Sequence, residues 1–232
     1  LAVTGATAAV VAARARSLSR RGARARELAR AMRDDCQAVL RHHGIQLDAA
    51  GAVPPGPALI ACNHVSWLDP LVVAACVPCA PISKLSVRGW PVVGALASRL
   101  GVIFHERGDG ASGLRVLRQA ERALEAGLPV LNFPEGTTTD GAGVLRFRKG
   151  LFGLARQLGV PVVPAAIRYE PADLAWTGDA TFVPHYLRLA ARGTSRVRLR
   201  FGGPLRSAAD EGDAAALAEA SRERVVALLE GA

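Results

Sequence analysis

Short apolar runs alternate with longer amphipathic stretches over most of this chain. A short apolar run bounded by glycine or proline is typical of a buried strand, whereas apolar residues three or four positions apart are typical of a helix. The first pattern predicts strands over residues 57–62, 82–84, 101–105, 129–133, 161–169 and 196–201. The second predicts helices over residues 68–76, 91–100, 111–126, 148–158 and 208–229. This alternation predicts an α/β fold with a mostly parallel sheet covered by helices, and residues 176–195 fit neither pattern.

A basic amphipathic segment precedes the alternating part. Eight arginines and one acidic residue, Glu27, lie between Arg14 and Arg33, which accounts for most of the net charge of +9. Apolar residues recur among and after these arginines at helical spacing: Leu18, Ala25, Leu28, Met32, Cys36 and Val39. A helix with one basic and one apolar face suits an anionic membrane surface. We therefore predict a membrane-binding helical arm over residues 1–50 and a catalytic domain over residues 51–232.

Two other interpretations of the basic segment remain open. The helix can simply cover the core with its arginines in water, or it can bind nucleic acid. No aromatic platform or recognised nucleic-acid-binding motif accompanies the arginines, so no nucleic acid partner is expected. The apolar run that includes residues 6–13 is shorter than the ~20 residues that a bilayer requires, although a longer segment upstream stays possible because the chain begins at Leu1. We expect a peripheral or monotopic protein at the cytoplasmic face of the cell membrane.

The four cysteines raise the question of a metal site. Cys76 and Cys79 form a C-x-x-C pair, which with Cys62 and His64 would offer four zinc ligands. A zinc site normally shows a second close pair on rigid turns, and none is present. Because this pair lies in an Ala/Val/Pro run, we predict buried thiols in a reducing compartment rather than a metal or redox site.

The candidate chemistry begins where the strand over residues 57–62 ends, in the segment Asn63-His64-Val65-Ser66-Trp67-Leu68-Asp69-Pro70. Open α/β sheets place their functional residues at the carboxyl ends of parallel strands. On a regular helix His64 and Asp69 would point about 140° apart, so they meet only if the chain turns between them. A carboxylate bound to one ring nitrogen would orient the histidine as a general base. The alternatives are a helix-capping Asp69 with a packed His64, and Ser66 as a nucleophile, for which no G-x-S-x-G motif exists.

Three more blocks follow in order: Gly101–Arg107, Phe133-Pro134-Glu135-Gly136-Thr137 and Val160–Pro164. With the first block, they resemble the four blocks of the glycerolipid acyltransferases, which include bacterial 1-acylglycerol-3-phosphate acyltransferases. The resemblance is close over residues 63–164 and looser over residues 54–205. It implies that His64 and Asp69 are catalytic. It also implies a set of acceptor-binding residues: Lys84, Arg107, Glu135, Gly136 and Thr137.

The resemblance also implies the reaction and the partners. An acyl chain would pass from acyl-CoA or acyl-carrier protein to the free hydroxyl of a lyso-lipid. His64 would take the hydroxyl proton and return a proton to the leaving thiolate, while Asp69 stabilises the imidazolium. No metal, other cofactor or covalent acyl-enzyme is required. The expected partners are therefore an anionic membrane surface, a lyso-lipid acceptor and the acyl thioester.

One departure from the family pattern bears on the acceptor. Many members that acylate lysophosphatidate continue the third block with Arg-Ser, whereas this chain has Thr138-Thr139-Asp140-Gly141. The change removes a cation and adds an acid, and it resembles members that act on lyso-ornithine lipid. Arg146, Arg148 and Lys149 are available to compensate. Lysophosphatidate, giving phosphatidic acid, is narrowly the first expectation and lyso-ornithine lipid the second. A hydrolase and a non-catalytic lipid-binding protein are the alternatives from other classes.

Overall fold

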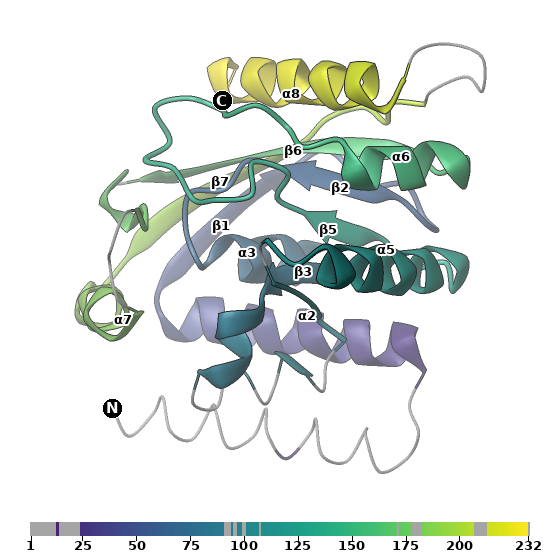
Figure 1. The fold of residues 1–232 in the computed structure, drawn as a ribbon. Helices are drawn as coiled ribbons and strands as arrows, with labels where there is room; N and C mark the ends of the chain where they lie inside the picture. Colours follow the sequence, from purple (N-terminus) through teal and green to yellow (C-terminus); the bar gives the residue numbers. More distant parts are fainter. Residues whose placement is uncertain are drawn as a thin grey trace.

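In the computed structural model, seven strands form one sheet in the order β1-β7-β6-β2-β5-β3-β4 (Figure 1). The structure describes residues 13, 24–90, 94, 97–98, 101–106, 108–170, 172–177, 182–206 and 213–231. The strands are β1 (Ile45–Ala50), β2 (Leu59–Cys62), β3 (Ala80–Lys84), β4 (Ile103–His105), β5 (Val130–Asn132), β6 (Val162–Glu170) and β7 (Ser195–Phe201). The helices are α2 (Ala25–His42), α3 (Asp69–Cys76), α5 (Gly110–Glu125), α6 (Gly150–Gln157), α7 (Phe182–Ala191) and α8 (Ala214–Glu230), with 3-10 turns η1 (Leu85–Gly89) and η2 (Ala172–Leu174).

The strand directions confirm the mostly parallel α/β fold. β6, β2, β5, β3 and β4 run parallel to their neighbours in this order, whereas β7 is antiparallel to β6 and β1 is parallel to β7. The carboxyl ends of the five parallel strands therefore lie along one edge of the sheet, which we call the carboxyl edge. Loops that leave this edge bring together residues that are far apart in the sequence.

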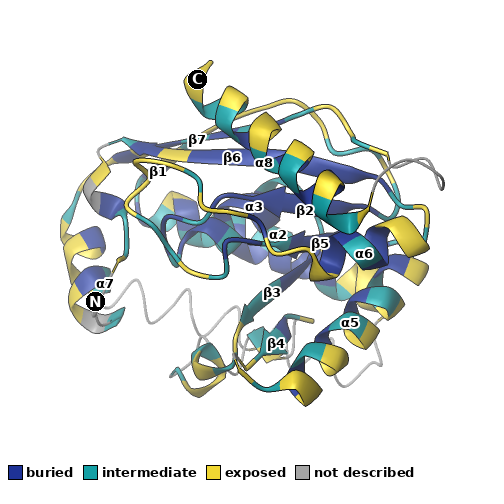
Figure 2. Cartoon of the chain, turned by 45° about the horizontal axis from the view of Figure 1, so that its top comes forward, coloured by how far each residue is buried: buried dark blue, intermediate teal, exposed yellow. Residues whose placement is uncertain are grey.

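The central strands β2, β5 and most of β6 are buried on both faces, as their nearly continuous apolar residues require. Successive side chains of a strand point to opposite faces, so Ile60 packs with α2 and α3 while Leu59 packs with α5, α6 and α8. In Figure 2 the central strands are dark blue, and the outward faces of α5, α6 and α8 are yellow. The central strands, β2 above all, are thereby held rigidly between two helical layers.

Helix α2 and strand β1 make up most of the predicted arm that the structure describes. The apolar residues Met32, Cys36 and Leu40 of α2 are buried in the core, and the Gln37 side chain donates a hydrogen bond to the Ala75 carbonyl of α3 (2.8 Å). Strand β1 then pairs with β7. The boundary predicted at residue 50 therefore falls inside one packed unit, and α2 fits the interpretation of a helix that covers the core. Periodicity reveals an apolar stripe but not which apolar partner covers it.

Other predicted elements differ from the structure in instructive ways. β1 lacks a continuous apolar run because it is a half-exposed edge strand. α7 lies in the unassigned stretch; its Pro184 is tolerated because it occupies the first turn. α8 begins at Ala214, where the Asp213 side chain caps it by accepting hydrogen bonds from the Ala215 and Ala216 amides. The predicted start of this helix, residues 208–212, lies outside the described residues. The predicted helix over residues 91–100 and the arm before residue 24 lie largely outside the described residues.

The cysteines occupy the positions expected of buried thiols. Cys36, Cys62 and Cys79 are buried and Cys76 is half-buried, and all four are free. Burial raises the pKa of the Cys36 thiol to about 12, so it stays protonated and unreactive. Among the helices that the structure describes, none is long and apolar enough to cross a membrane.

Candidate active site

The His64–Asp69 pair lies in the turn between β2 and α3, at the carboxyl edge. β2 ends at Cys62 and α3 begins at Asp69, so the chain reverses between the two side chains. His64 Nδ1 and Asp69 Oδ2 are 2.7 Å apart. The turn predicted from the five-residue spacing is therefore present. With the carboxylate on Nδ1, the neutral ring carries its proton there and leaves Nε2 as a proton acceptor.

The Asp69 carboxylate is fully buried yet well supplied with donors. Besides the His64 contact, Oδ2 accepts hydrogen bonds from the backbone amides of Val65 (2.6 Å) and Ser66 (2.9 Å). Oδ1 accepts a hydrogen bond from the Tyr169 hydroxyl (2.7 Å). A buried charge is costly unless donors replace its lost hydration, and these four do so. Asp69 is thus held in one position to serve His64.

The main chain and ring of His64 are fixed as well. Its amide donates to Glu135 Oε1 (3.1 Å), and its carbonyl accepts from the amide (2.8 Å) and hydroxyl (3.3 Å) of Thr139. The imidazole stacks on Phe133, with ring centroids 4.3 Å apart. The side chain keeps 19% of its surface exposed, and within the described part of the chain no hydrogen bond engages Nε2. That nitrogen is the one left for a reactant.

Asn63 anchors the start of this turn to β6. Its side-chain amide accepts from the Ile167 amide (2.8 Å) and donates to the Ile167 carbonyl (3.0 Å). These two bonds continue the β2–β6 ladder beyond Cys62, with a side chain in the place of a backbone strand. The direction in which the chain leaves β2, and hence the place of His64, is set by this pair.

Glu135 contacts the main chain of His64 from the loop that follows β5. Only 4% of its surface is exposed. Burial raises the pKa of Glu135 to about 7, with a further increase from the charge of Asp69 and an opposing effect of the hydrogen bond from the His64 amide. The carboxylate contacts the main chain of His64 rather than an open surface. Its predicted role in binding the acceptor stays a prediction.

Gly136 makes the sharp turn after Glu135. Its φ of +73° is unfavourable for other residues, and an added Cβ would lie 2.7 Å from Arg148 Cζ. The exposed Arg148 guanidinium therefore rests on this turn, while the Arg148 amide donates to the Pro134 carbonyl (3.0 Å). A cation thus stands beside the loop that holds His64.

Comparison with known proteins agrees with this arrangement. The family model described as Acyltransferase matches residues 44–168. This chain belongs to the acyltransferase family. It is 35% identical over 213 residues to the lyso-ornithine lipid O-acyltransferase of Brucella abortus, a match that covers 84% of this chain and 79% of that protein.

Two further matches come from other branches. The 1-acyl-sn-glycerol-3-phosphate acyltransferase of Neisseria gonorrhoeae is 33% identical over 143 residues, covering 62% of this chain and 54% of that protein. The crystal structure of the 1-acyl-sn-glycerophosphate acyltransferase from Thermotoga maritima superposes with a TM-score of 0.60, 23% identity, and coverage of 88% of this chain and 83% of that chain. The last match shows a shared fold.

Two of the remaining predicted residues of this acyltransferase, Lys84 and Thr137, follow strands that end at the same edge. Lys84 is exposed at the end of β3, in register with His105 of β4. Thr137 is exposed just beyond the turn at Gly136. Arg107 lies outside the described residues. Ser66 has no exposed surface, so a substrate cannot reach its hydroxyl and it does not qualify as a nucleophile.

An aromatic cluster, absent from the sequence predictions, borders the His64–Asp69 turn. Ring contacts connect Trp67, Trp90, Trp176, Phe182 and Tyr186. The Trp67 indole donates to His185 Nδ1 of α7 (2.9 Å). Because the members come from four separate segments, no local pattern could have revealed the cluster. It holds α7 against the turn that carries the candidate base.

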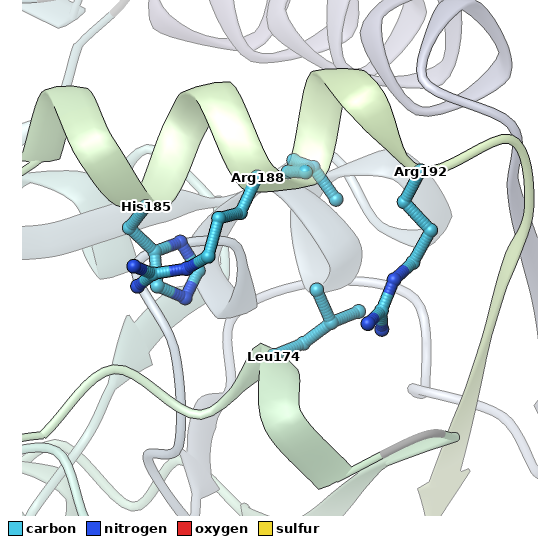
Figure 3. Close-up of a pocket in the computed structure, with 5 residues that line it drawn as sticks. Leu174, His185, Arg188 and Arg192 are labelled. Carbon is cyan, nitrogen blue, oxygen red and sulfur yellow. The ribbon is translucent and has the colours of Figure 1, made fainter.

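A small cavity lies beneath α7. Figure 3 shows the residues that line it: His185 and Arg188 come from α7, Arg192 directly follows this helix, and Leu174 belongs to η2. The volume is about 30 Å³. A cavity needs roughly 10–15 Å³ to hold one water molecule, so this one has no room for a lipid chain. It is therefore not a binding site for the acyl group.

Proposed function

We propose that this acyltransferase moves an acyl chain directly from an acyl thioester to the free hydroxyl of a lyso-lipid, with His64 as the general base. The observation that supports this most strongly is the His64–Asp69 hydrogen bond at the carboxyl edge (2.7 Å). It leaves a partly exposed ring whose Nε2 is open to a reactant. A histidine oriented in this way by a carboxylate is suited to taking a proton from a hydroxyl.

The proposed reaction balances without a covalent enzyme intermediate. The acceptor oxygen attacks the thioester carbonyl while its proton passes to His64 Nε2. The C–S bond then breaks, and the imidazolium returns the proton to the leaving thiolate of coenzyme A or acyl-carrier protein. Asp69 stabilises the imidazolium, and Phe133 keeps the ring in place by stacking. Proton transfer by a positioned group contributes on the order of 10²–10⁴ in rate.

The loop after Gly136 supports lyso-ornithine lipid as the acceptor ahead of lysophosphatidate, which reverses the order expected from sequence. The ornithine headgroup is zwitterionic, with an ammonium and a carboxylate. Charges complementary to both groups lie at this loop. The Arg148 guanidinium contacts the turn at Gly136, and Asp140, four residues after Gly136, is exposed. The match to the Brucella protein, which is named a lyso-ornithine lipid O-acyltransferase, covers most of both chains and agrees with this order. Lysophosphatidate, which is 1-acylglycerol-3-phosphate, remains the second candidate because the Neisseria relative is named a 1-acyl-sn-glycerol-3-phosphate acyltransferase.

Thiol release from acyl-CoA or acyl-carrier protein, measured with and without lyso-lipids, tests this proposal. We expect release to require a lyso-lipid and to be faster with lyso-ornithine lipid than with lysophosphatidate. Thr138→Arg should shift the ratio of kcat/KM values toward lysophosphatidate by about tenfold, since a cation near a phosphate gains a charge-assisted contact. Ala142→Arg adds the same charge to the same loop and serves as the control.

Two outcomes would count against the proposal. Release of free fatty acid without an acceptor would indicate a hydrolase, and no release with any acceptor would indicate a lipid-binding protein. An equal change in selectivity from Thr138→Arg and Ala142→Arg would mean that net charge, rather than this loop, sets the acceptor.

We also propose that the arginines between Arg14 and Arg33 bind the acyltransferase to an anionic membrane, at its cytoplasmic face. Reversing Arg20 and Arg30 to glutamate should weaken binding to phosphatidylglycerol vesicles at least 30-fold, because each basic residue near the surface contributes about 1 kcal/mol. Arg30 is exposed on α2. Reversing Arg118 of α5 and Arg224 of α8, both exposed on the other face of the sheet, changes the net charge equally. In vesicle co-sedimentation this control should lose much less binding than the Arg20 and Arg30 variant. An equal loss of binding in the two variants, or binding that does not depend on salt, would refute the proposed membrane-binding role of these arginines.

A further inference from the structure

Tyr169 is a buried polar residue of β6 that the proposed reaction has not yet used. It has 5% of its surface exposed, and its hydroxyl donates to Asp69 Oδ1 at 2.7 Å. We propose that Tyr169 is a positioning residue of the acyl-transfer site, which fixes the carboxylate of Asp69 and, through it, the orientation of His64. This inference rests on the proposed role of His64 as general base.

The contacts of Asp69 show why such a residue matters. Its three other donors all bind Oδ2 and all come from residues 64–66, in the same turn as Asp69. The terminal torsion of an aspartate is soft and broad, so donors on one oxygen alone leave the carboxylate plane poorly fixed. Tyr169 binds the other oxygen and comes from a different element. The two sets of contacts together define the plane of the carboxylate.

β6 gives Tyr169 a rigid base. The strand lies between β2 and β7 in the sheet. Two residues before Tyr169, Ile167 exchanges both of its main-chain hydrogen bonds with the side chain of Asn63. His64 and the Asp69 carboxylate are therefore both anchored to β6: His64 through the neighbouring Asn63, and the carboxylate through Tyr169.

The hydroxyl is suited to a permanent donor role. Burial and the charge of Asp69 raise the pKa of the Tyr169 hydroxyl well above its usual value, so it keeps its proton at any pH at which the enzyme works. A donor to Oδ1 also disperses the carboxylate charge that His64 feels. Its removal should leave a carboxylate that holds the imidazolium more strongly but in a less defined orientation.

Tyr169→Phe keeps the ring in the core and removes only the hydroxyl. We expect kcat for acyl transfer to fall about tenfold, with KM for both substrates within twofold. The acidic limb of the kcat profile should move to higher pH, because the imidazolium is held more strongly. Tyr186→Phe, which alters the chain's only other tyrosine, should change neither quantity. In an Asp69→Asn background, Tyr169→Phe should have no further effect on kcat, since the charged partner is gone.

Three results would overturn the proposal: a wild-type kcat and pH profile for Tyr169→Phe, a change confined to KM, or an equal loss of rate in the Asp69→Asn background. If Tyr169→Phe fails to fold, fluorotyrosine incorporated into the Tyr186→Phe protein probes the same hydroxyl. Its more acidic hydroxyl is a stronger donor and should move the acidic limb to lower pH, and an unmoved limb would refute the role. Failure of the proposed function itself would look different, because the wild type would then release no thiol with any lyso-lipid.

Discussion

His64→Ala is expected to lower acyl transfer by about 10³-fold while leaving the fold intact, because the imidazole is the proposed proton acceptor. The main-chain contacts of residue 64 with Glu135 and Thr139 do not depend on its side chain. The ring is partly exposed and stacks on Phe133. Without it the buried Asp69 carboxylate keeps three other donors, so loss of the ring should cost little stability. Thiol release measures the activity. Thermal unfolding and vesicle binding test whether the fold and the membrane affinity are unchanged.

His105→Ala is the matched control for this variant. His105 ends β4 at the same carboxyl edge and is also partly exposed. It should retain near-normal turnover. A His64→Ala protein within tenfold of the wild type, or an equal loss in His105→Ala, would remove His64 from the mechanism.

Glu135→Ala should lower kcat on the order of 10²-fold, the second largest effect that we expect. The substitution leaves the His64 amide buried without its acceptor, which costs about 1–3 kcal/mol and loosens the turn. Glu135→Gln keeps an acceptor oxygen there and should lose only about tenfold. KM for the lyso-lipid should change little in either variant. A rise in KM with an unchanged kcat would instead support the family expectation that Glu135 binds the acceptor.

Glu135 should also make the free energy of unfolding depend on pH. The pKa of Glu135 is raised from 4.5 to about 7, so between these values the folded protein binds more protons than the unfolded chain. The free energy of unfolding should therefore fall as pH rises from about 4.5 to about 7. Glu135→Gln should lack this component, whereas Glu125→Gln, at an exposed position on α5, should keep it. Near neutral pH the Glu135→Gln protein would then be less active but more stable than the wild type, a trade-off that is common at functional sites.

The sequence predicted the parts of the site that are local, and the structure supplied those that are not. His64 and Asp69 are five residues apart, so their meeting needed only a turn. Tyr169, which is 100 residues from Asp69, was not predicted. Glu135 was predicted to bind the acceptor, but its contact with the main chain of His64, 71 residues away, was not. A tyrosine in an apolar strand gives no sign of the partner that it will face. Only the pairing of β2 with β5 and β6 brings these residues together.

The fold shows the same division. The central strands are buried on both faces, so their apolar runs stood out in the sequence. The apolar stripe of α2 was equally visible, but a stripe packed on α3 and a stripe inserted in a bilayer have the same period. β1 and α7 were missed because each mixes exposed and buried residues without a clean repeat. Periodicity measures the spacing of apolar residues along the chain. It does not identify the surface against which those residues pack, so that surface could not be predicted.

The contact between the loop after Gly136 and the histidine has a consequence for how this family diversifies. The shorter of the two Thr139 hydrogen bonds to the His64 carbonyl comes from a backbone amide, a group that every residue except proline possesses. The side chains of Thr137 and Asp140 meanwhile stand exposed on the outside of the loop. These outward side chains can therefore be substituted, which would alter the proposed headgroup recognition, without disturbing the proposed proton acceptor. Such a separation would let one catalytic site serve acceptor lipids with chemically different headgroups.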